Sequence, residues 1–83
     1  MSKLIFRMKY ADKKWPEYLT EVFGEEIASK CTIESNATAL DYNARIKIDD
    51  FKNDKNVIDK LKNNENIISA FIIDNYQAKE VIV

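Results

Sequence analysis

Apolar and polar residues alternate along two stretches of this 83-residue chain. In residues 4–10, every second residue is large and apolar or aromatic, and Arg7 and Lys9 lie between them. In residues 40–48, the same alternation sets apolar residues against Asp41, Arg45 and Lys47. Because successive side chains of a strand point to opposite faces of its sheet, this period of two predicts two half-buried strands.

A helical spacing follows the first of these strands. Asp12 can cap a helix and Pro16 suits only a first turn, so the helix is expected to begin near these two residues. Gly24 either ends this helix as a left-handed cap or lies inside it, and the sequence leaves both alternatives open. The apolar residues that recur every three or four positions on one helix face are Trp15, Leu19, Val22, Phe23 and Ile27.

A second helix is expected after Asn53 or Asp54, either of which can act as its cap. Its apolar residues Val57, Ile58 and Leu61 share one face, and the polar residues 62–64 end it. The sequence thus predicts two amphipathic helices, each of which needs an apolar surface to pack against.

Three further segments have strand patterns. Residues 29–34 form a weaker strand with Cys31 and Ile33 on one side, and residues 35–37 favour a turn. Residues 67–73 carry β-branched residues on both faces, which predicts a strand buried more completely than the others. Residues 77–83 end in an apolar tail that could form a fifth strand.

The order of the elements is strand, helix, strand, strand, helix, strand. Because βαβ crossovers are right-handed, both helices are expected on the same sheet face. The sequence therefore predicts an α+β fold, a ferredoxin-like βαββαβ sandwich with a four-stranded antiparallel sheet, two helices on one face and a possible fifth C-terminal strand. The chain has no internal linker or repeat, so residues 1–83 are expected to form a single domain.

The residue types argue against several kinds of site. The chain has no His and a single Cys, Cys31, so it lacks an internal disulfide and the usual zinc, copper and haem ligand sets. Without His it has no base for a Ser–His or Cys–His nucleophile, and its one glycine cannot form a phosphate-binding loop. We therefore expect no enzyme activity, no catalytic residue, no metal and no cofactor.

One candidate binding surface remains. If the apolar sides of the first and third strands pack on the helices, their other sides present Arg7, Lys9, Arg45 and Lys47. The net charge is −1, so any attraction for a polyanion must come from this local arrangement. RNA-binding sheets also need aromatic residues on that face. Here the aromatic residues of both strands fall on the side that is predicted to face the core, so nucleic acid is not the expected partner.

A resemblance to a known family rests on residues 40–48, on residues 57–61 and on Asn64, Glu65, Asn66 and Ile67. The pattern spans roughly residues 17–73. It resembles the small soluble C-terminal domain of certain bacterial multi-pass membrane proteins. One such group is an uncharacterised family often found beside polyphosphate-polymerase-like proteins, and the magnesium-stress MgtC/SapB group is a more distant candidate. The resemblance implies a cytoplasmic, non-catalytic module that regulates or couples to a membrane part.

The leading functional hypothesis is a non-enzymatic regulatory or protein-interaction domain, the cytoplasmic module of a membrane protein. The first alternative is polyanion binding, with nucleic acid or polyphosphate held on the basic sheet face, and the second is a small phage-type inhibitor. The longest apolar stretch is too short to span a bilayer, so this chain itself carries no expected membrane span. A protein partner or a homodimer, formed through a sheet edge or the C-terminal tail, is expected.

Overall fold

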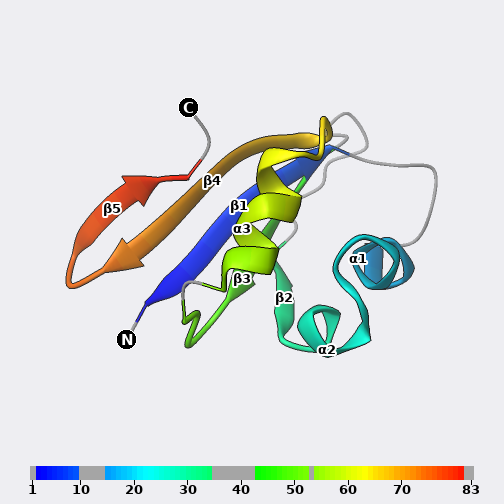
Figure 1. Ribbon diagram of the computed structural model, residues 1–83, viewed down its shortest axis with the longest axis horizontal. Coiled ribbons are helices and arrows are strands. Elements are labelled where there is room, and N and C mark those ends of the chain that lie inside the picture. Colours follow the sequence, from blue (N-terminus) through cyan, green and yellow to red (C-terminus); the bar gives the residue numbers. More distant parts are fainter. Residues whose placement is uncertain (1, 10–14, 35–42, 53, 82–83) are drawn as a thin grey trace.

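The computed structural model describes residues 2–9, 15–34, 43–52 and 54–81, and the side chains of Trp15 and Asn43 are not described. Five strands and three helices follow along these residues (Figure 1). Their order is β1 (Lys3–Lys9), α1 (Trp15–Phe23), α2 (Glu25–Ala28), β2 (Cys31–Glu34), β3 (Asn43–Ile48), α3 (Lys55–Lys62), β4 (Ile67–Asp74) and β5 (Gln77–Glu80).

The five strands form one antiparallel sheet in the order β2-β3-β1-β4-β5. The first strand of the chain therefore lies in the middle, between β3 and β4. In its register Phe6 is opposite Ile46 on β3 and Ala70 on β4. All three of these residues are buried, so one row of the core crosses the three central strands.

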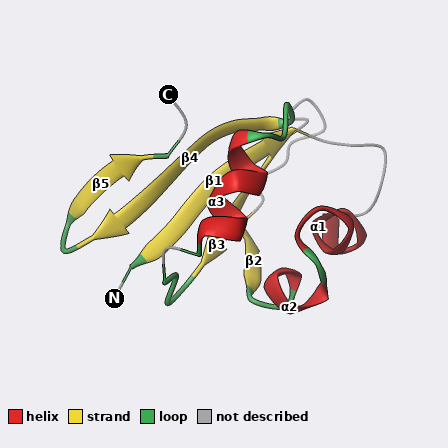
Figure 2. Ribbon diagram, viewed as in Figure 1, coloured by secondary structure: helices red, strands yellow, loops and turns green. Residues whose placement is uncertain are grey.

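The helices cover one face of this sheet, and the core lies between the two layers (Figure 2). The ring of Phe23 on α1 meets the ring of Phe6 edge to face, with the ring centroids 5.5 Å apart. Such aromatic pairs add to the burial of apolar area that stabilises the layer. The fully buried large side chains are Leu4, Phe6, Met8, Leu19, Ile46, Val57 and Leu61.

Gly24 divides the first helical segment into α1 and α2. Its φ of 87° is one that residues with a side chain rarely adopt, and its ψ of 160° is extended. Of the two alternatives that the sequence left open, the structure shows the one in which Gly24 ends α1 rather than lying inside the helix. Its ψ, however, is not that of a left-handed helical cap. Pro16 lies in the first turn of α1, as predicted, and the expected cap Asp12 lies outside the described residues.

Asp54 is the cap of α3, one of the two residues that the sequence offered. Its carboxylate accepts a hydrogen bond of 2.9 Å from the backbone N–H of Asn56. Val57 and Leu61 point into the core from one side of the helix, while Lys60 and Lys62 lie in its last turn, where positive charge is favourable.

Two polar contacts involve the helices: one joins α1 to the residue before β4, and the other joins α3 to the end of α1. The side-chain amide of Asn66, just before β4, donates to the Tyr18 hydroxyl at 2.7 Å. The ammonium of Lys60 lies 3.5 Å from the backbone carbonyl of Phe23 at the end of α1. The first bond satisfies the polar end of a tyrosine whose ring is buried in the core.

The expectation that residues 67–73 form a strand buried more completely than the others is wrong. Ile68 is 46% exposed and Phe71 is 37% exposed. The pairing of β4 with β1 shifts by one residue between Arg7 and Met8, so that Arg7 is opposite Ser69 and Met8 is opposite Ile67. Such a bulge leaves one residue, Ile68, without an opposite partner. Phe71 lies on the sheet face opposite the helices, because it pairs with Ile5.

The C-terminal segment forms the fifth strand that the sequence left open. Asp74 and Gln77 close a two-residue turn at Asn75 and Tyr76, whose φ angles of 49° and 66° are both positive. These angles match the type I′ turn that two-residue hairpins prefer. Val81 is buried, and its N–H donates to the carbonyl of Ala70 at 2.9 Å. The fold is therefore α+β, with one more strand and one more short helix than the minimal prediction.

Leu61→Ala should lower the free energy of unfolding by about 2–5 kcal/mol, because it leaves a cavity where a fully buried side chain packs. Urea unfolding followed by circular dichroism measures the change. The matched control is Lys62→Ala, one residue further along the same helix and exposed, which should change stability by less than about 0.5 kcal/mol. Equal losses in the two variants would contradict this description of the core.

Tyr76→Gly should raise the free energy of unfolding by up to about 1 kcal/mol. The tyrosine side chain is fully exposed, so its removal loses no packing, while glycine adopts a positive φ without strain. The same urea titration tests this. Ala78→Gly, in the adjoining strand, is the control and should instead destabilise. A destabilised Tyr76→Gly variant would show that the turn does not have these angles.

Candidate functional site

The four basic residues singled out in the sequence lie on the central strands β1 and β3. Arg7, Lys9 and Arg45 are exposed and Lys47 is half-buried. Their strand positions alternate with the buried core positions, so all four are on the sheet face that the helices leave open. Arg7 is directly opposite Arg45 in the β1–β3 register. The structure thus brings together the residues that the sequence predicted to share a face.

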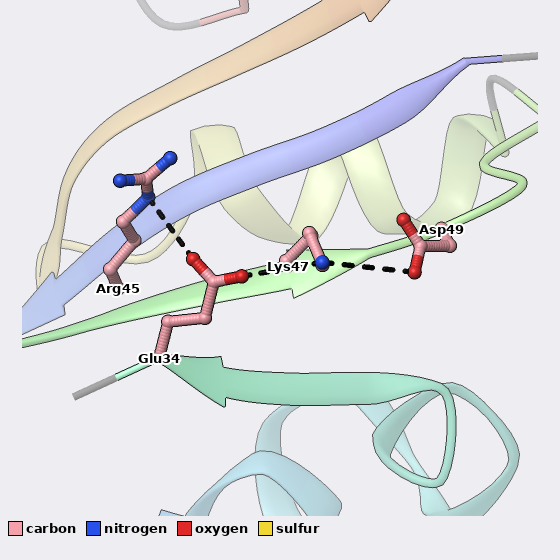
Figure 3. Close-up of polar contacts among 4 residues, drawn as sticks. All are labelled: Glu34, Arg45, Lys47 and Asp49. Atoms are coloured by element: carbon pink, nitrogen blue, oxygen red, sulfur yellow. Dashed lines mark ion pairs between the residues drawn. The ribbon is translucent and has the colours of Figure 1, made fainter.

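Carboxylates from two neighbouring segments pair with this basic group (Figure 3). Glu34 on β2 lies 3.6 Å from Nε of Arg45 and 3.3 Å from Nζ of Lys47. Asp49, just after β3, lies 3.9 Å from the same Lys47 nitrogen. Exposed pairs of this kind contribute about 0–1 kcal/mol each. They partly neutralise the β3 side of the open face and can be displaced by a stronger anion.

The open face also contains a shallow groove of about 210 Å³. Its side-chain lining comes from three adjacent strands, with Arg45 on β3, Ile5 and Arg7 on β1, and Ser69 and Phe71 on β4. Sequence reasoning missed Phe71, because large apolar residues occupy both alternating sets of positions in residues 67–73. The available signal was the single polar residue Ser69, which shares the parity of Phe71 and marks the open side of the strand.

The β4–β5 hairpin extends beyond α3 (Figure 1). A second depression lies there, on the helix side of the sheet. Its volume is about 590 Å³, and its apolar wall consists of Ile58 on α3 and Ile72 on β4. The polar residues around it come from the hairpin and are Asp74, Asn75, Gln77 and Lys79. We call this depression the hairpin cleft.

The outer edge of β5 is free of any described strand. The hydrogen bond from Val81 to Ala70 marks a bonded pair of the β4–β5 ladder. Bonded and non-bonded pairs alternate in an antiparallel ladder, so Phe71 with Glu80 and Ile73 with Ala78 are non-bonded pairs. The backbone N–H and C=O groups of Ala78 and Glu80 consequently point away from β4, toward the outer edge of the sheet.

Cys31 begins β2 and is partly buried against the core. Its Sγ lies 3.4 Å from the carbonyl of Ile27 and donates to it. Burial raises the pKa of the Cys31 thiol from its ordinary value of 9.0 to about 11. The side chain is therefore a protonated thiol at neutral pH, which is the unreactive form.

Within the part of the chain that the structure describes, no group of three or more His, Cys, Asp and Glu residues could hold a metal ion. Nor does any helix of that part combine the length and apolar character of a membrane span. Comparisons with protein-family models, with curated proteins and with solved structures found no match to this chain.

Alkylation of Cys31 in the folded protein at pH 8 should be about 100-fold slower than in urea, because a pKa higher by two units lowers the thiolate fraction by that factor. The folded pKa is the higher one, so this thiol contributes stability below pH 9 that is lost as the pH rises toward 11. The free energy of unfolding of the parent, measured against pH, minus that of Cys31→Ala isolates the contribution of the thiol. Equal alkylation rates in both states would contradict the burial.

Proposed function

We propose that this chain is a non-enzymatic protein-interaction domain that binds an extended segment of a partner protein along the outer edge of β5. The observation that carries this proposal is the orientation of the backbone groups of Ala78 and Glu80, which point away from β4. A partner strand would bond to these groups and extend the sheet. This mode of recognition takes its affinity from the main chain and its specificity from alternate side chains.

The surroundings of the edge support such a partner. Exposed edge strands tend to pair with other chains unless they are blunted, for example by proline, lysine or an inward-pointing charge. β5 has no proline and its four side chains are all exposed, but it carries Lys79, which lines the hairpin cleft on the helix side, so the edge is only partly blunted. The hairpin cleft lies beside it and offers an apolar wall of Ile58 and Ile72. Every second side chain of a bound segment would face the helix side, where an aliphatic residue fits this cleft.

Tyr76 at the tip of the hairpin is a second feature that favours a partner at this surface. Its side chain is fully exposed at a positive φ, where glycine or asparagine is the less strained choice. Strained positions of this kind occur preferentially at functional sites, and tyrosine is one of the residues that contribute most to protein interfaces. A partner that buries the ring would compensate for the strain that the free protein carries.

The proposed domain is ferredoxin-like, regulatory and cytoplasmic. The order β2-β3-β1-β4 within the sheet supports a ferredoxin-like domain to which β5 adds an edge. A regulatory rather than catalytic role is supported by the absence of His from the sequence and by the raised pKa of Cys31. The single unpaired thiol fits a cytoplasmic module, as in the membrane-protein family that the sequence resembles.

Two substitutions at one position test the proposal. Ala78→Pro removes the outward N–H and leaves the β4–β5 ladder intact, whereas Ala78→Val keeps that N–H. The parent, Ala78→Val and Ala78→Pro are tagged and expressed in the native cell. The parent and Ala78→Val should capture the same partner, and Ala78→Pro should capture at least about tenfold less of it. With the purified partner, hydrogen exchange should slow at Ala78 and Glu80 in the complex.

Thermal unfolding of both variants verifies that they are folded before binding is compared. Self-association through this edge would appear as a doubled mass for the parent and Ala78→Val and a monomer mass for Ala78→Pro, and would identify a second copy as the partner. A partner captured equally by all three proteins, or no partner and no self-association, would refute strand addition at β5.

A further inference from the structure

The groove on the open sheet face combines two arginines with an exposed aromatic ring. Arg7 and Arg45 lie directly opposite each other on β1 and β3, and Phe71 lies opposite Ile5 on the other side of β1. We propose that this groove binds single-stranded nucleic acid, with a phosphate held at the two arginines and a base stacked on Phe71. This function is additional to the interaction at β5 and uses a different surface.

The charge arrangement favours a bound phosphate. Arg7 and Arg45 lie opposite each other in the register and both line the groove, so a phosphate bound there would meet two positive charges. Arg45 contacts Glu34 through Nε, and its two terminal nitrogens point away from Glu34 (Figure 3). The guanidinium fork can therefore present these nitrogens to a phosphate, for which its geometry is suited.

The aromatic ring distinguishes a nucleotide from a simple polyanion. Phe71 is 37% exposed, and the groove beside it is walled by Ile5 and by Ser69, which lies opposite Arg7 in the β1–β4 register. A base can stack on such a ring whatever its identity, because every base has a π face. Polyphosphate has no planar group, so it can use the arginines but not Phe71.

The shape and the remaining charges favour a single strand. The groove holds about 210 Å³, and in a duplex the faces of the bases are already stacked on one another and cannot reach Phe71. Lys9 extends the positive surface along β1 beyond Arg7, while Glu34 and Asp49 neutralise much of Lys47. On the β5 side, Glu80 lies opposite Phe71, and its negative charge ends the positive surface there. The site therefore spans a few nucleotides across β3, β1 and β4.

The sequence predicted no aromatic residue on the open face, because the aromatic residues of the first and third predicted strands fall on the core side. The ring of Phe71 comes instead from β4. The four basic residues expected to bind an anion also receive different roles. Arg7 and Arg45 border the groove, Lys9 extends it and Lys47 is held by carboxylates.

The first experiment measures the binding of short fluorescein-labelled oligo(dT) and oligo(U) by anisotropy at low salt. Phe71→Leu keeps an apolar side chain but removes the ring, and it should weaken binding by about 5- to 150-fold, the effect of one stacked base. Tyr76→Leu removes the exposed aromatic of the hairpin tip and is the matched control. It should bind as the parent does, since Tyr76 is not part of the groove. Circular dichroism confirms that both variants fold.

The second experiment tests the phosphate contacts. Arg45→Gln should weaken oligonucleotide binding by about tenfold and flatten its salt dependence by roughly 0.7 in the slope of log K against log salt for each lost phosphate contact. Glu34→Gln should strengthen binding, because it removes the carboxylate that competes for Arg45. Lys62→Gln on α3 removes an exposed charge from the helix side and should have little effect.

Several outcomes would overturn the inference. Failure of the parent to bind either oligonucleotide at low salt is one of them. Another is equal binding by the parent and Phe71→Leu, with polyphosphate competing as well as an oligonucleotide, since the face would then be a simple polyanion surface. Tighter binding to duplex than to single strands, or to an acidic peptide than to an oligonucleotide, would also refute it. None of these results depends on the β5 edge, which Ala78→Pro tests separately.

Discussion

Burial of the sheet on one face only is the constraint on which the rest of this structure depends. A chain of 83 residues buries a smaller share of its surface than a larger protein does, and here three helices cover one side of the sheet. The contact of Phe6 with Phe23 and the burial of Leu61 fix this layer. None of the described helices covers the opposite side of the sheet, so the residues there can be selected for something other than packing.

The open side is arranged by charge. Glu34 contacts both Arg45 and Lys47, so one carboxylate serves two cations on the neighbouring strand. Arg7 and Arg45 remain opposite each other across β1 and β3. Weak exposed ion pairs of this type set the local potential more than they set stability. They hold the side chains in place while leaving them able to exchange one anion for another.

The C-terminal hairpin changes where the sheet ends. β4 would otherwise be an edge strand, and its exposed residues Ile68 and Phe71 would lie beside unpaired backbone groups. β5 pairs with β4 and moves the edge outward to four exposed residues, while Val81 adds to the core beside Ala70. The positive φ of Tyr76 is the strain that this tight connection requires. The same segment thus completes the core and presents the free edge.

The sequence by itself determined the α+β class and the face shared by Arg7, Lys9, Arg45 and Lys47, and it narrowed the α3 cap to Asn53 or Asp54. These features follow from periodicity and from local capping, which act over a few residues. It did not determine the exposure of Phe71, the split of the first helix at Gly24 or the direction of the backbone groups of β5. Each of these depends on which strand lies beside which, because only the pairing of β4 with β1 and β5 assigns a strand with large apolar residues at both alternating sets of positions its covered and open sides. Tertiary structure alone therefore decided how the ring, the arginines and the free edge are combined into surfaces.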